Sequence, residues 1–104
     1  MSFPLPFSPA NGKTTKITAN ATPTSVAGDL AVVAGPTRIS VLNNGTVPVF
    51  VHLSPTTAPT ATTGDFPMKA GERLTLDGNG ITAAAVLSST TTACDVYFSW
   101  GEGG

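Results

Sequence analysis

The alternation of apolar and polar positions is clearest across residues 37–53, where two β-branched runs flank Asn43-Asn44-Gly45. An Asn-Gly pair between two such runs is typical of a β-hairpin. A three-residue loop at 43–45 collects the apolar side chains on one face, because a shift of one residue turns every side chain over. The pattern therefore predicts a type I turn with Gly45 as the left-handed bulge residue. The predicted apolar face consists of Thr37, Ile39, Val41, Val47, Val49 and Val51.

A second hairpin is predicted from residues 73–76 and 81–87, which flank the turn sequence Asp-Gly-Asn-Gly at 77–80. The period of two directs Leu74 and Leu76 inward. The small alanines of the return strand indicate that another sheet or backbone packs closely there. The face predicted for that strand consists of Ile81, Ala83, Ala85 and Leu87.

Other segments complete the expected strands. Residues 14–19 are mostly β-branched, residues 30–33 form a short apolar run, and residues 65–68 return the chain to the core. Residues 54–64 are rich in Thr, Ala and Pro and predict a long loop, which is either a partner contact or a slack connection. The last strand, 94–100, directs alternate residues to the core, namely Cys94, Val96, Phe98 and Trp100.

Several short strands separated by turns, with no convincing helical pattern, predict an all-β protein. We expect roughly six to eight strands in an antiparallel, jelly-roll-like β-sandwich or barrel. The length of 104 residues suits one domain. We place this domain at residues 14–104, preceded by an extended N-terminal arm at residues 1–13.

The arm contains prolines at positions 4, 6 and 9, which disfavour a helix and a central strand. Phe3, Leu5 and Phe7 stand between them, so an extended backbone directs all three side chains to one side. Burial of each is worth about 1.5–3 kcal/mol. The arm either folds back on its own domain or docks on a neighbouring chain, with a frayed terminus as the alternative. We expect the arm to dock on a neighbouring chain.

The charge of the chain is low. Only 11% of residues are charged, and the net charge is −1, so nothing favours nucleic acid or an anionic membrane as a partner. No apolar run approaches a membrane span, and the first ten residues lack the pattern of a secretory signal. A weakly charged surface is either covered by partners or simply a neutral, Thr-rich β-surface.

The residues that carry chemistry are few and scattered. The single histidine, His52, has no partner motif, and the single cysteine, Cys94, fits a buried structural thiol. Asp77 and Asn79 resemble the opening of a calcium loop but lack its remaining ligands. We therefore expect no catalytic residue, no cofactor and no metal site.

Large side chains on outward faces are more informative. Phe50, His52 and Tyr97 are predicted to point away from the core, which is typical of a contact surface, a second layer or a loop-covered face. Together with the arm they give a predicted interface consisting of Phe3, Leu5, Phe7, Phe50, His52 and Tyr97.

Three stretches carry a resemblance to a known group of proteins. They are N-x-G-T-x-P-V-F-V within residues 38–51, D-F-P-M-K-A-G-E at 65–72, and Y-x-x-W-G-E-G-G at 97–104. They resemble small β-rich structural proteins of tailed-bacteriophage virions. The resemblance implies a non-enzymatic capsid decoration, or cement, protein on the capsid surface, assembled in the bacterial host cytoplasm. Its implied partners are copies of itself, with a trimer favoured, and the major capsid protein or other virion subunits.

Two alternatives stay open. One is a tail- or fibre-associated position on the virion. The other is a carbohydrate- or receptor-binding module that uses Phe50, Tyr97 or Trp100 as stacking platforms.

Overall fold

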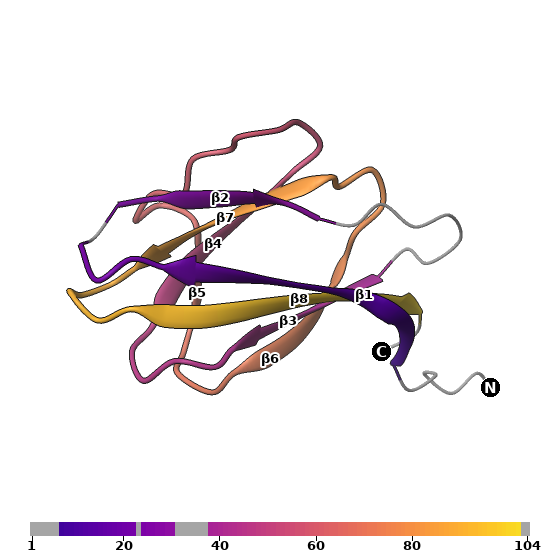
Figure 1. The fold of residues 1–104 in the computed structure, drawn as a ribbon, viewed down its shortest axis with the longest axis horizontal. Coiled ribbons are helices and arrows are strands. Elements are labelled where there is room, and N and C mark those ends of the chain that lie inside the picture. The colour runs from indigo at the N-terminus through magenta and orange to yellow at the C-terminus, as the bar shows by residue number, and fades with distance from the viewer. Residues whose placement is uncertain (1–6, 23, 31–37, 103–104) are drawn as a thin grey trace.

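The computed structural model describes residues 7–22, 24–30 and 38–102. These residues form eight strands and no helix, arranged as two packed sheets (Figure 1). The all-β sandwich expected from the sequence is therefore confirmed. The strands are β1 (Ser8–Ala19), β2 (Val26–Asp29), β3 (Arg38–Asn43), β4 (Val49–Ser54), β5 (Phe66–Met68), β6 (Arg73–Asp77), β7 (Ala83–Ser88) and β8 (Cys94–Glu102).

The strand order is that of a jelly roll. One sheet, here sheet A, has the order β1-β8-β3-β6, and sheet B has the order β2-β7-β4-β5. The first strand pairs with the last, the second with the seventh, the third with the sixth and the fourth with the fifth, all antiparallel. This nested pairing corresponds to one long hairpin rolled into a sandwich with two Greek keys.

Both predicted hairpins are wrong. β3 and β4 lie in different sheets, as do β6 and β7, so residues 44–48 and 78–82 are corners between the sheets. Among the described glycines, positive φ angles occur at Gly12, Gly71 and Gly80 and not at Gly45. A hairpin and a corner can bury the same alternate residues, so the apolar pattern does not distinguish them.

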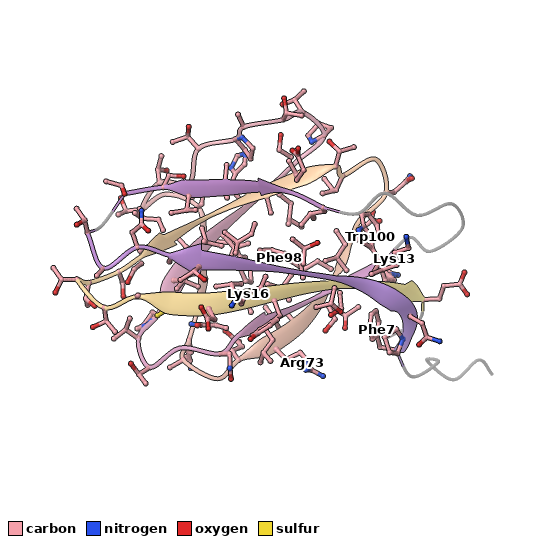
Figure 2. All side chains as sticks on the ribbon, in the orientation of Figure 1. Phe7, Lys13, Lys16, Arg73, Phe98 and Trp100 are labelled. Carbon is pink, nitrogen blue, oxygen red and sulfur yellow. The ribbon has the colours of Figure 1, made fainter. Side chains whose placement is uncertain are left out.

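The faces predicted for β3, β4 and β8 are confirmed by their burial. Val41 and Val49 are fully buried, and Phe98 and Trp100 lie within the sandwich (Figure 2). Leu74 and Leu76 pack against this core while staying partly exposed. Thr37 lies outside the described residues. The buried core residues of these three strands are Ile39, Val41, Val49, Val51, Cys94, Val96, Phe98 and Trp100.

The face predicted for β7 is wrong. Ala84 and Val86 belong to the core cluster between the sheets, so Ala83, Ala85 and Leu87 have the opposite orientation. Ala83 and Ala85 are nevertheless fully buried. Residues on both faces of β7 are therefore buried. The strand lacks the alternating polar residues that would indicate which face is inward.

The boundaries of two early elements also differ from the prediction. β1 begins at Ser8, so residues 8–13 of the expected arm belong to a strand whose register shifts between Pro9 and Thr14. Phe3 and Leu5 lie outside the described residues. The strand expected at 30–33 is not observed at Leu30, which follows β2, while 31–33 lie outside the described residues.

Candidate functional site

The four predicted interface residues that the structure describes do not share one surface. Phe7 and Tyr97 belong to the outer side of sheet A, whereas Phe50 and His52 lie on the outer face of sheet B. The two outer faces are therefore separate candidate sites.

A row of hydroxyl groups crosses all four strands of sheet A. The strand register places Thr75 opposite Ser40, Ser40 opposite Ser99, and Thr14 opposite Ser99. The neighbours of Ser40, Thr75 and Ser99 along their strands pack in or against the core, so period-two geometry directs these three hydroxyls outward. Thr14 lines the same groove. Thr14 and Ser99 are hydrogen bonded at 2.9 Å between their hydroxyl oxygens. No local sequence signal marks this row, because its members come from four distant segments.

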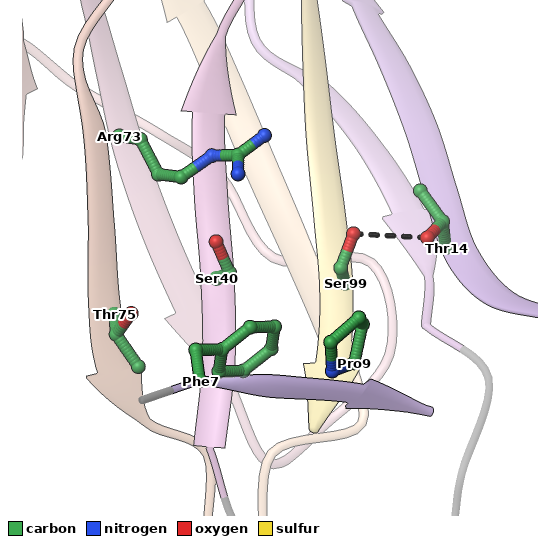
Figure 3. A pocket seen from close by; sticks show the side chains of 7 residues that line it. All are labelled: Phe7, Pro9, Thr14, Ser40, Arg73, Thr75 and Ser99. Atoms are coloured by element: carbon green, nitrogen blue, oxygen red, sulfur yellow. Dashed lines mark hydrogen bonds between the residues drawn. The ribbon is translucent and has the colours of Figure 1, made fainter. Parts of the chain in front are cut away.

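The row forms the floor of a groove of about 420 Å³. Phe7 closes one end beside Pro9, and the side chain of Arg73 extends from β6 across β3 towards β8 (Figure 3). Phe7 thus packs on its own domain. The groove combines hydroxyls, one guanidinium and one aromatic ring.

The outer face of sheet A also holds much of the positive charge. Lys16, Arg38 and Arg73 are three of the five Lys and Arg residues of the chain. Within the described residues, Arg73 forms no hydrogen bond or ion pair, and it is the single charged residue that lines the groove. Asp95 is already engaged, because it accepts a hydrogen bond of 2.8 Å from the Thr18 hydroxyl.

The outer face of sheet B carries an apolar patch. Cross-strand pairing aligns Pro67, Phe50 and Leu87 in one row on this face. Phe66 pairs with the core residue Val51, so it faces the core side of the edge strand β5, where it is 47% exposed. Among the described residues, Phe66 is the one large hydrophobic residue that is exposed to solvent. We call Phe50, Pro67 and Leu87, together with Phe66 at the adjoining sheet edge, the sheet B patch.

Beside this patch, the loop 55–65 is fixed to its own domain. The Ala61 amide donates to the Ser25 hydroxyl next to β2 at 2.8 Å, and Ala61 itself is buried. The Thr82 hydroxyl donates to the carbonyl of Pro55 at 3.0 Å. In Figure 1 the loop between β4 and β5 extends above β2. Of the two hypotheses for this segment, a slack connection is therefore inconsistent with its contacts.

His52 and Asp65 anchor the end of the loop. Nδ1 of His52 lies 2.9 Å from a carboxylate oxygen of Asp65. The ionised carboxylate only accepts hydrogen bonds, so the imidazole carries its proton on Nδ1. The other oxygen of Asp65 accepts from the Thr62 amide at 2.7 Å. The hydrogen bond from His52, followed by that from the Thr62 amide, lowers the pKa of Asp65 from its ordinary value of 3.8.

This lowered pKa predicts a loss of stability in acid. The stabilisation is complete above the ordinary pKa and is lost as pH falls through the lower pKa of the folded state. We therefore expect the difference in unfolding free energy between wild type and Asp65→Asn to be larger at pH 6 than at pH 2.5, measured by urea unfolding. Asp29→Asn, an exposed position, is the control and should show no such difference. Equal differences at both pH values for Asp65→Asn would contradict the assignment.

Sequence reasoning missed the carboxylate that orients His52. The two residues are thirteen positions apart, with His52 on β4 and Asp65 directly before β5, and nothing in the sequence marks that proximity. In the described part of the chain, His52 has no further hydrogen bond, and Cys94 is buried in the core cluster. Groups of three or more His, Cys, Asp or Glu able to hold a metal do not occur among residues 7–22, 24–30 and 38–102. The hydrogen bond between His52 and Asp65 thus anchors the end of the loop to β4.

Trp100 is 4% exposed, so its proposed role as a stacking platform is wrong. Tyr97 is half-buried on the outer face of sheet A, two residues from Ser99 along β8. It borders the groove without lining it.

Within the described ranges, no helix is long and apolar enough to cross a membrane. Comparisons with protein-family models, curated proteins and solved structures gave no significant match.

Proposed function

We propose that the protein is a non-enzymatic structural protein of a tailed-phage virion, of the capsid decoration type. In this proposal it self-associates, with a trimer favoured, and contacts the major capsid protein or other subunits on the capsid surface. Nucleic acid, membranes and cofactors have no part in the proposed mechanism. The sequence resemblance in residues 38–51, 65–72 and 97–104 supports this class of protein.

The observation that carries the proposal is the sheet B patch. It joins an exposed phenylalanine at the sheet edge to a row of apolar side chains on the outer face, and contiguous apolar surface is typical of interfaces. Burying such surface against a neighbour stabilises association by about 25 cal/mol per Å² before the costs of association. The jelly roll is compatible with this role, since it occurs in viral capsid domains, but it also occurs in lectins.

The test is the oligomeric state of the purified chain. We expect wild type to sediment as an oligomer, and Phe66→Ser with Leu87→Ser to raise the dissociation constant at least tenfold (~1.4 kcal/mol). The matched control is Lys16→Ser, an exposed position on the opposite sheet, which should associate like wild type. A monomeric wild type, or unchanged association of the double variant, would overturn the proposal.

A second candidate function, carbohydrate or receptor binding, is favoured by a separate observation. The groove on sheet A combines an aromatic ring with several hydroxyls and a guanidinium (Figure 3). Such a mixture of one apolar wall and a few polar groups is typical of small-ligand sites.

A further inference from the structure

We propose that the groove on sheet A binds an acidic monosaccharide unit of the uronate class, which is a pyranose ring that carries a carboxylate group. This inference deepens the second candidate function, carbohydrate binding, on which it rests. It does not depend on the decoration role, because the sheet B patch lies on the other sheet.

Arg73 supplies the recognition of the carboxylate. Its side chain reaches across β3 above Ser40, so the guanidinium faces the groove and not the edge of β6 (Figure 3). A planar guanidinium fork matches a carboxylate with two parallel hydrogen bonds. No described carboxylate forms an ion pair with Arg73, so its charge is available to a ligand.

The hydroxyl row supplies the recognition of the sugar ring. Each Ser or Thr hydroxyl donates one hydrogen bond and accepts others, as sugar hydroxyls do. Ser99 is held by Thr14 at 2.9 Å. Ser40 and Thr75 form no side-chain hydrogen bond with another described residue, and Ser40 is only 5% exposed. Their hydroxyls lie beside Arg73 in the same groove, where they can bond to a ring held by its carboxylate.

Phe7 and Pro9 supply the apolar wall. One face of a pyranose presents mainly C–H groups, which pack against an aromatic ring whose face carries partial negative charge. The groove volume of about 420 Å³ lies at the lower end of the range for ligand sites, roughly 300–1,000 Å³. This size suits one or two sugar units.

Each simpler ligand leaves part of the groove unused. A neutral sugar provides no charge for Arg73, whereas acetate or inorganic phosphate makes little use of Phe7 and the hydroxyl row. An acidic sugar uses all three features, and we therefore expect it to bind more tightly than either.

The experiment is a titration of the ¹⁵N-labelled full chain followed by NMR chemical shifts. Galacturonate is the probe, galactose is its neutral counterpart, and acetate and phosphate are the anions without a sugar ring. We expect millimolar binding of galacturonate, with shifts of the Ser40, Thr75 and Ser99 amides. Galactose, acetate and phosphate should each bind at least tenfold more weakly.

Arg73→Gln should weaken galacturonate binding at least tenfold, and Arg38→Gln is the matched control. Arg38 lies on the same face opposite Asp77 without lining the groove, so its replacement should change the affinity less than twofold. Dispersed amide spectra will show that both variants fold.

No detectable galacturonate binding up to about 50 mM, or equal binding by Arg73→Gln, would overturn the proposal. Equal affinity for galactose would remove the role of the carboxylate, and equal affinity for acetate or phosphate would reduce the site to a plain anion site. Sedimentation and ligand titration are independent measurements. A failed titration therefore does not affect the assembly proposal, and a monomeric protein does not affect the proposal of sugar binding.

Discussion

Replacement of Asn43 by leucine is expected to lower the free energy of unfolding by about 3 kcal/mol, although Asn43 belongs to an apparent turn sequence. The side chain is fully buried, and its Nδ2 lies 3.0 Å from the carbonyl oxygen of Val47. It also lies 3.3 and 3.1 Å from the carbonyl oxygens of Met68 and Lys69. The side-chain oxygen of Asn43 accepts a bond of 3.0 Å from the Gly45 amide. One amide therefore joins the corner after β3 to the end of β5, across the two sheets.

The size of the expected effect follows from the groups left behind. An amide has two N–H donors, so the three carbonyl contacts share them. Leucine satisfies none of the partners, and each buried polar group left without a partner costs about 1–3 kcal/mol. Some relaxation towards water reduces the sum.

Thermal and urea unfolding will measure the loss, which corresponds to a fall in Tm of roughly 12–24 °C for a domain of this size. Asn44→Leu is the matched control, because Asn44 is the exposed neighbour and its replacement should stay within about 0.5 kcal/mol of wild type. A loss below about 1 kcal/mol for Asn43→Leu would contradict the role assigned to this amide.

The second large effect is expected at Gly45, where alanine should lower the free energy of unfolding by about 3 kcal/mol. A Cβ atom at this position would meet Sγ of Cys94 and would lie 2.6 Å from Cβ and 3.1 Å from Cα of the same residue. The Asn44 amide donates to the Asp95 carbonyl at 2.9 Å, which holds the corner against β8. Cβ and Cα cannot rotate away, so the cost is at the upper end of the 1–3 kcal/mol that is typical of overpacking.

A double-mutant cycle separates this contact from a general effect of alanine. Cys94→Ala retains the close Cβ, so it should relieve little of the Gly45→Ala loss. Cys94→Gly removes that atom, so a favourable coupling of at least about 1 kcal/mol is expected in the double variant. Gly64→Ala is the matched control, because its nearest neighbour would lie 3.6 Å away. A Gly45→Ala protein as stable as the Gly64→Ala protein would contradict the close-approach explanation.

These two positions show how a local pattern misleads. Asn43-Asn44-Gly45 has the composition of a hairpin turn, yet Asn43 is a buried hydrogen-bonding centre and Gly45 admits the close approach of β8. Asn and Gly are selected here by burial and by space, and the same residue types are favoured by turns. Composition alone does not separate these causes.

The candidate sites also cannot be predicted from local sequence patterns. Alternation predicts outward faces for Phe50 and Tyr97, but only the fold separates them onto opposite sheets. The partner of His52 and the hydroxyl row depend on contacts between distant segments, such as Thr14 with Ser99, which are 85 residues apart. Nothing in the sequence marks Arg73 as a binding residue, because an arginine on a strand has no evident role until the residues around it in the fold are known.

The all-β class and the buried faces of β3, β4 and β8 can be predicted from the amino-acid pattern alone. These follow from the alternation of side chains along an extended chain, which is a local geometric property. The strand pairing, the corners that cross between the sheets and the inward face of β7 are known only from the three-dimensional fold. Those features depend on how eight short strands share one core, because several arrangements bury the same alternate residues and differ only in their long-range contacts.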